Sequence, residues 1–237
     1  MKPYIISING LDGSGKETTS KALIEAIEKD PQVKMDLEYV SFPDYTSKTG
    51  ERIKKVLSGD YSSIKYGDNP FTRPYEVARL FADNRKEYFK NHPLKDNTIY
   101  VFDRYVESNI LYQGLGKSGD ELFWFNEALR DMDEGNPIPN ISIFLRVPYI
   151  ELRRRLDLRK SMKAGIDHDK YEDDSFLKGV YHLSEYILLL PKGQINPYDL
   201  VINVGSGNLC QPVEFIVNQI IDTLKNRNEY IQFHYRS

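Results

Sequence analysis

Five short apolar runs recur along the chain, and each is followed by a longer segment with a helical or irregular pattern. The runs lie at residues 4–8, 39–42, 98–102, 141–147 and 200–204. Such alternation is typical of a parallel sheet with helices on both faces, which binds its ligands at the carboxyl ends of the strands. After Pro212, the last helical segment has apolar residues at helical spacing, namely Val213, Ile216, Val217, Ile220, Ile221 and Leu224. This spacing predicts a helix with one buried face.

Size and composition limit the possible architectures. The 237 residues, of which 40% are hydrophobic, suffice for the core of one α/β domain, alone or with an inserted lid. A formal net charge of −3 argues against nucleic acid or an anionic membrane as a partner of the whole surface. The single cysteine, Cys210, excludes an internal disulfide and a cysteine metal cluster. No apolar stretch approaches the ~20 residues that span a bilayer, so we expect a soluble protein of the cytoplasm.

A glycine-rich loop follows the first apolar run and opens the first helical segment. Strand, glycine-rich loop and helix in this order form a phosphate cradle, because glycines let successive backbone N–H groups point at one anion. The helix N-terminus adds partial positive charge, and Lys16 can reach the outer phosphates of a nucleotide. The loop therefore predicts nucleotide binding by Gly10, Asp12, Gly13, Ser14, Gly15, Lys16, Glu17 and Thr18.

The position after Lys16 departs from the usual pattern, in which a serine or threonine hydroxyl holds Mg²⁺. Here it is Glu17, and Thr18 follows. A carboxylate can bind Mg²⁺ directly, but its charge also repels phosphate oxygens. We favour a Glu17 side chain that turns into solvent and leaves the inner metal position to water or to Thr18. The alternative is that Glu17 is itself a metal ligand.

An acid and a base end the third apolar run. Asp103 and Arg104 come just past the carboxyl end of that predicted strand, beside the glycine-rich loop if the sheet is wound as expected. The carboxylate of Asp103 can hold Mg²⁺ through water, and the guanidinium of Arg104 can clamp a phosphate. A lone pair of this kind could equally be a surface ion pair.

Other motifs accompany this pair. Residues 42–43 read FP, residues 80–85 read LFADNR, residues 103–114 read DRYVESNILYQG, and residues 168–172 read HDKYE. With the glycine-rich loop, these five motifs in this order resemble the thymidylate kinase family, P-loop enzymes that transfer the γ-phosphoryl group of ATP to dTMP. The resemblance covers most of the chain. It implies a P-loop NTPase fold over residues 1–237, a three-layer α/β sandwich with a five-stranded parallel sheet, and it implies ATP and Mg²⁺ as cofactors and a homodimer.

The resemblance also assigns roles to residues. Phe81 would stack on the thymine, while Arg85 and Gln113 would hydrogen-bond to it. Arg104 would hold the monophosphate and act with Lys16 in catalysis. The other residues expected to bind the substrate are Asp12, on the side of the 3′-hydroxyl, Tyr171, which would pack against the sugar and disfavour a 2′-hydroxyl, and Phe42, Tyr45, Ser108 and Tyr112.

A run of cations at residues 153–163 is similar to the lid of this family, and we expect a short mobile lid at about residues 153–172. Phosphoryl transfer spreads negative charge over the moving group, and a closing lid can bring a cation to it. The glycine-rich loop supplies no arginine, because Gly13 follows Asp12. We therefore expect Arg159 and Arg155 to be the catalytic candidates, although such a run is also typical of a solvated helix face.

Two further departures from the family pattern affect the choice of function. Tyr45 stands where the family commonly has a phosphate-binding arginine, and Arg146 stands where it commonly has aspartate. A tyrosine hydroxyl donates one hydrogen bond but carries no charge. The alternatives to a dTMP kinase are therefore a nucleotide-binding protein with impaired catalysis and a kinase of another deoxynucleoside monophosphate. A further alternative is a deoxynucleoside kinase, but kinases of that class usually have Glu-Arg-Ser at the positions of Asp103, Arg104 and Tyr105.

Overall fold

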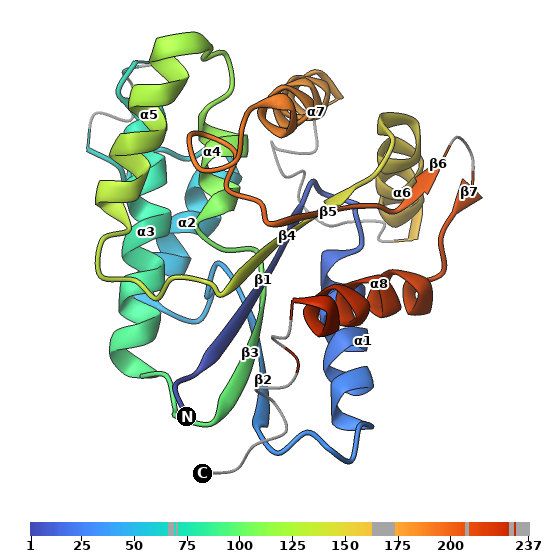
Figure 1. The fold of residues 1–237 in the computed structure, drawn as a ribbon. Coiled ribbons are helices and arrows are strands. Elements are labelled where there is room, and N and C mark those ends of the chain that lie inside the picture. The colour runs from blue at the N-terminus through green and yellow to red at the C-terminus, as the bar shows by residue number, and fades with distance from the viewer. Residues whose placement is uncertain (66–68, 70, 163–173, 207–208, 228–229, 231–237) are drawn as a thin grey trace.

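The computed structural model describes residues 1–65, 69, 71–162, 174–206, 209–227 and 230. Its main sheet has five parallel strands in the order β2-β3-β1-β4-β5 (Figure 1). The strands are β1 (Tyr4–Gly10), β2 (Asp36–Ser41), β3 (Thr98–Asp103), β4 (Ile141–Arg146) and β5 (Leu200–Asn203). The predicted five-stranded parallel sheet is confirmed. A two-stranded antiparallel pair, β6 (Gly205–Ser206) and β7 (Leu209–Cys210), was not predicted.

Eight helices lie in the described part of the chain. They are α1 (Lys16–Glu28), α2 (Lys48–Leu57), α3 (Arg73–Asn91), α4 (Glu107–Gln113), α5 (Gly119–Met132), α6 (Tyr149–Met162), α7 (Asp174–Leu189) and α8 (Val213–Asn226). Figure 1 shows α1 and α8 on one face of the sheet and α2 to α5 on the other. Helices α6 and α7 lie near the end of the sheet at which β1 leads into α1. The three layers of the predicted sandwich are therefore present.

The core forms between the sheet and these helices. Every residue of β1 and of β3 is buried, because both strands have neighbours on either side and helices on both faces. On α8, the residues Ile216, Val217, Ile220 and Leu224 are buried, and Val213 and Ile221 pack against the core. The predicted apolar face of this helix is thus in place, with Pro212 at the N-cap. None of the described helices is long and apolar enough to cross a lipid bilayer.

The register of the sheet brings the predicted motifs together. In β1, Ile8 lies opposite Asp103 of β3, and Gly10 lies opposite Leu145 of β4. Because all strands run in one direction, the glycine-rich loop after β1 and the turn after β3 emerge at the same edge. The predicted lid begins in α6, while residues 163–172 lie outside the described residues.

Candidate active site

The glycine-rich loop connects β1 to the start of α1 and has the backbone that its sequence requires. Gly10 has φ +152°, and a Cβ atom at this position would lie 2.6 Å from Ser14 Oγ and 2.9 Å from the Leu145 carbonyl oxygen. Gly15 has φ +88°, in the left-handed region that glycine adopts without a steric penalty. Helix α1 begins at the next residue, Lys16. The N-terminus of α1 therefore opens directly into the loop, as a phosphate site requires.

Lys16 is buried among polar groups of this loop. Its Nζ donates a 2.7 Å hydrogen bond to the Leu11 carbonyl oxygen. Burial and the nearby charge of Arg104 lower the pKa of Lys16 to about 7, against the opposing effects of Asp12 and Asp103. The negative charges of Asp12 and Asp103 are therefore too weak to keep the pKa of this ammonium group at its ordinary value. Phosphate oxygens would supply further negative charge.

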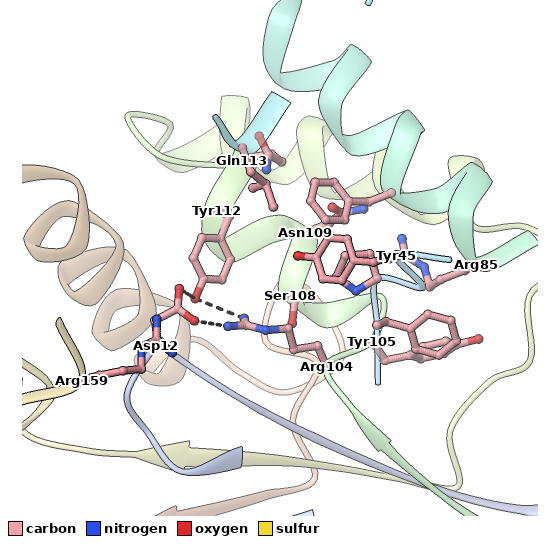
Figure 2. A pocket seen from close by; sticks show the side chains of 14 residues that line it. Asp12, Tyr45, Arg85, Arg104, Tyr105, Ser108, Asn109, Tyr112, Gln113 and Arg159 are labelled. Carbon is pink, nitrogen blue, oxygen red and sulfur yellow. Dashed lines mark hydrogen bonds and ion pairs between the residues drawn. The ribbon is translucent and has the colours of Figure 1, made fainter. Parts of the chain in front are cut away.

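Arg104 is the first residue after β3, and its backbone is left-handed, with φ +63°. This conformation is uncommon for a residue with a side chain and persists where the surroundings hold it. The guanidinium pairs with the Asp12 carboxylate and also donates a 3.2 Å hydrogen bond to the Tyr112 hydroxyl. Tyr112 in turn donates to the other carboxylate oxygen of Asp12 at 3.1 Å, and Figure 2 shows these three side chains together.

The charges in this group fit one another. Burial alone would raise the pKa of the Asp12 carboxyl, but Arg104 and Lys16 outweigh that effect and hold the pKa below its usual value. Burial by itself lowers the pKa of the Arg104 guanidinium, and Asp12 together with Tyr112 and Asp103 more than reverses this, so the pKa is raised. Asp12 therefore stays negative and Arg104 positive at neutral pH.

A cavity of about 240 Å³ opens beside this group. The structure brings together around it all the described residues that the sequence assigned to substrate binding: Asp12, Phe42, Tyr45, Phe81, Arg85, Arg104, Ser108, Tyr112 and Gln113. Tyr171 lies outside the described residues. The cavity combines aromatic faces with amide and guanidinium donors, which is what a small planar base needs in order to be oriented.

Arg85 is fixed in this cavity wall by an ion pair that the sequence did not suggest. Its Nε and Nη2 atoms donate to the two carboxylate oxygens of Asp133 at 2.8 and 2.7 Å. The side chain is only 3% exposed, and its guanidinium lies 5.9 Å from the centre of the Tyr105 ring. Two of the five N–H donors are thus engaged, which leaves three for other partners. The pair holds the guanidinium plane in one orientation.

Sequence reasoning missed several residues of this region. Asn109, Tyr105, Pro43 and Leu57 also line the cavity. Asn84 lies behind it, and its amide bonds to the Asp44 N–H and carbonyl and to the hydroxyls of Ser47 and Thr49, at 2.8–3.0 Å. These bonds hold the segment that carries Tyr45. Asn84 lies in the motif at residues 80–85 between the charged Asp83 and Arg85, so no local pattern marked it as buried.

Tyr45 itself has no arginine-like charge, but a cation lies nearby. Its side chain lines the cavity, and the ammonium group of Lys54 on α2 lies 5.6 Å from the centre of its ring. Arg146, the other departure from the family pattern, faces away from this cavity and pairs with Glu185 of α7.

The predicted metal ligands lie in two different environments. The Oδ1 atom of Asp103 is buried and has no hydrogen-bond partner among the residues that the structure describes, while Oδ2 accepts a 3.2 Å bond from the Tyr39 hydroxyl. A buried carboxylate oxygen of this kind fits the hydration shell of Mg²⁺. The side chain of Glu17 is 66% exposed, and its carboxylate lies 2.5 Å from Lys21 Nζ. Thr18 is exposed.

The cations of α6 divide into two groups. Arg155 donates to the Gly13 carbonyl oxygen at 3.0 Å and to the Glu151 carboxylate at 2.7 Å. Arg159 lines the cavity, and its charge contributes to the lowered pKa values of Asp12 and Lys16. Arg153 and Arg154 instead pair with acidic residues of α6 and α7. The two catalytic candidates on α6, Arg155 and Arg159, thus both face the glycine-rich loop.

These features together define a class of protein. A phosphate loop after a central parallel strand, an acid and an arginine after the adjacent strand, and arginines facing the loop are the parts of a P-loop phosphotransferase. The cavity beside Arg104 has the size and the donors for a second, small substrate.

Comparisons with known proteins identify the family. The family model described as Thymidylate kinase matches residues 8–190, so the chain belongs to the thymidylate kinase family. The thymidylate kinase of Lactobacillus helveticus is 28% identical over 229 residues, which cover 96% of this chain and 98% of that protein. The probable thymidylate kinase of Pyrococcus horikoshii is 31% identical over 170 residues, or 68% and 74% of the two chains. The solved structure of thymidylate kinase from Candida albicans shares the fold, with a TM-score of 0.66 at 20% identity over 97% and 94% of the chains.

The environment of Lys16 predicts proton uptake on ATP binding. Its pKa is about 7 in the free protein, and phosphate oxygens raise the pKa of a neighbouring ammonium group. With this pKa, a large part of the free protein has a neutral Lys16 at pH 8, so ATP binding should take up protons and the affinity should fall as the pH rises above 7. Calorimetry in buffers of different ionisation enthalpy measures this uptake. Lys16→Arg is the control, because arginine stays charged and takes up no proton; wild-type binding without uptake at pH 8 would contradict the prediction.

Proposed function

We propose that the protein transfers the γ-phosphoryl group of ATP to dTMP and forms ADP and dTDP. The observation that carries this proposal is the cavity of about 240 Å³. Asp12, Arg104 and Tyr112 form one bonded group in its wall, and Asp12 belongs to the phosphate loop, so the cavity lies directly beside that loop. A monophosphate held by Arg104 would have its base in this cavity and its phosphate beside Lys16. The acceptor phosphate would then lie next to the donor phosphate, as in-line transfer requires.

The base would be oriented by the residues that line the cavity. Phe81 offers an aromatic face for stacking. Arg85, held by Asp133, has N–H donors for a carbonyl of the base, and the side-chain amides of Gln113 and Asn109 offer both donors and acceptors. Because these groups lie on rigid helices, they read the base with little loss of side-chain freedom on binding.

The charge that develops during transfer would be stabilised from several sides. Lys16 would contact the outer phosphates of ATP, and Arg104 would hold the monophosphate. Arg159 would add a further cation from α6. Asp103 would hold Mg²⁺ through water, and the cation would supply charge neutralisation for the phosphate oxygens. All four residues lie at the carboxyl edge of the sheet, where β1 and β3 end.

We also propose that the protein works in the cytoplasm as a homodimer, which the family resemblance implies. Size-exclusion chromatography with light scattering measures the oligomeric state.

A second candidate function, nucleotide binding with impaired catalysis, is favoured by one observation, which is that Glu17 stands where the family pattern has a metal-binding hydroxyl.

A coupled assay of ADP release separates the two candidates. With ATP and Mg²⁺ at saturation, dTMP should give the highest kcat/KM in a panel with dUMP, dGMP and dCMP. The reason is that the cavity has donors suited to the carbonyl groups of thymine, and its apolar lining of Phe42, Leu57 and Phe81 favours the 5-methyl group that dUMP lacks. Identification of dTDP by chromatography confirms the product. Absence of ADP release above background for every monophosphate would exclude the kinase and leave the binding protein.

The position of Glu17 predicts the effect of restoring the hydroxyl. Since its carboxylate is paired with Lys21 at the surface of α1, replacement should remove no metal ligand. Glu17→Thr should therefore lower the Mg²⁺ concentration for half-maximal activity and raise kcat, as measured by Mg²⁺ titration of the coupled assay. Glu17→Gln is the matched control, because it removes the charge without adding a hydroxyl. A lower kcat or a weaker Mg²⁺ dependence in Glu17→Thr would instead identify Glu17 as a ligand.

The two arginines of α6 should differ in their effect on turnover. Arg159 faces the cavity, whereas Arg155 is bonded to the loop carbonyl of Gly13 and to Glu151. Arg159→Ala should lower kcat by about a hundredfold or more with a small change in nucleotide affinity, since a cation used in the transition state does little in the ground state. Steady-state kinetics and equilibrium binding measure the two effects. A loss of kcat confined to Arg155→Ala would transfer the role to that residue.

A further inference from the structure

A buried group of polar side chains lies beneath the turn that carries Arg104. It consists of Ser7 and Asn9 on β1, Ser142 on β4 and Glu107 at the start of α4, all of them buried. The Glu107 carboxyl accepts hydrogen bonds from the hydroxyls of Ser7 and Ser142 and from the side-chain amide of Asn9. Buried polar groups are costly unless they are satisfied, and this group is separate from the cavity that binds the substrate.

Asn9 connects this group to the turn. Its Oδ1 atom accepts from the Tyr105 N–H at 3.3 Å and from the Ser108 hydroxyl at 3.1 Å. Its Nδ2 atom lies 3.4 Å from Glu107 Oε2 and 3.3 Å from Ser7 Oγ. The backbone N–H of Tyr105 can only donate, so the amide oxygen must face the turn and the amide nitrogen must face Glu107. The Tyr105 N–H and the Glu107 carboxyl together therefore determine which way the Asn9 amide points.

The turn needs such support because Arg104 is left-handed. Two successive N–H groups are held from β1: that of Arg104 by the Ile8 carbonyl oxygen at 3.0 Å, and that of Tyr105 by the Asn9 side chain. The first bond continues the pattern of the sheet, whereas the second depends on one side chain. A change in the direction of this turn would move the Arg104 guanidinium away from Asp12 and Tyr112.

We propose that Asn9, oriented by Glu107, is a positioning residue for phosphoryl transfer, which holds the left-handed turn and so aims Arg104 at the acceptor phosphate. The proposal rests on the proposed function, in which Arg104 binds the monophosphate. Neither Asn9 nor Glu107 lines the substrate cavity, so both act through the turn that Asn9 holds, which carries Arg104 and, next to it, Tyr105 and Ser108 of the cavity wall.

An exchange of polarity tests this arrangement. Asn9→Asp keeps the acceptor for Tyr105 but replaces the donor toward Glu107 with a second acid. We expect KM for dTMP to rise at least tenfold, with KM for ATP within twofold of wild type. Glu107→Gln should leave both KM values nearly unchanged, because the glutamine carbonyl can face Asn9 and the glutamine amide can donate to the hydroxyls of Ser7 and Ser142. In Asn9→Asp/Glu107→Gln the glutamine amide can turn and donate to the new aspartate, so most of the loss should be recovered.

Two controls separate positioning from general loosening of the core. Asn126→Asp changes another buried asparagine, whose amide donates to the Gln194 carbonyl far along the chain, and should lower thermal stability without changing either KM. Asn9→Ser, which replaces the amide with a shorter, neutral hydroxyl, should also raise KM for dTMP, but Glu107→Gln should not rescue it, because serine offers no carboxylate to the glutamine amide. Asn9→Ser also provides the test if Asn9→Asp does not fold.

A spectroscopic readout keeps the proposal independent of the substrate. The Nε–H signal of Arg104, assigned by its loss in Arg104→Lys, should shift in Asn9→Asp and return in the double variant. The proposal is overturned if the double variant is no better than Asn9→Asp, if KM for ATP rises in parallel with KM for dTMP, or if the Arg104 signal does not move. A wild-type protein without dTMP turnover would instead refute the proposed function, and the Arg104 signal would still decide the positioning role.

Discussion

The pairing of β1 with β3 is the constraint on which the rest of the site depends. With Ile8 opposite Asp103, the loop after β1 and the turn after β3 leave the sheet side by side. The bond from the Arg104 N–H to the Ile8 carbonyl oxygen extends this pairing one residue beyond the strand. A slip of one residue would reverse the faces of the strand and move Arg104 away from Asp12. Because both strands are buried on both faces, the register is strongly specified.

The same pairing also concentrates positive charge. Lys16 and Arg104 come from adjacent segments of the sheet edge, and Asp12 lies between them. Within this group one carboxylate faces a buried lysine and a half-buried arginine, and the pKa of the lysine is about 7. The group is therefore arranged for a more negative environment than the protein itself provides. A perturbed lysine beside a phosphate loop and a cavity is typical of a functional site.

Support for the side chains of the site comes from groups that do not line the cavity. Asp133 holds Arg85, Asn84 holds the segment of Tyr45, and Asn9 with Glu107 holds the turn of Arg104. Asn84, Asn9 and Glu107 are buried and Asp133 is half-buried, each makes several hydrogen bonds, and each lies on a helix or a strand or next to one. Binding groups held in this way lose little freedom when a substrate arrives, so more of the interaction energy remains for affinity and catalysis.

The sequence by itself determined the features that depend on contiguous residues. The five strands, the apolar face of α8 and the glycine-rich loop follow from local periodicity and from the conformational freedom of glycine, and the structure contains all of them. The motifs also indicated which residues would gather at one cavity, since the carboxyl ends of parallel strands meet at one edge. Their roles toward the nucleotide stay predictions.

Only the tertiary structure decided which partners these residues have. Arg85 and Asp133 are 48 positions apart, and Asn9 and Glu107 are 98 apart, so no local pattern pairs them. Arg159 faces the cavity because of how α6 packs beside the loop. The spacing of Glu17 and Lys21 permits an ion pair but also permits other side-chain directions, and only the structure shows that the pair forms. Hydrogen bonds and ion pairs act over a few ångströms in space, whereas a single sequence records only distance along the chain. Local sequence patterns therefore determined the strands, helices and loops, whereas tertiary packing determined the contacts that orient the site.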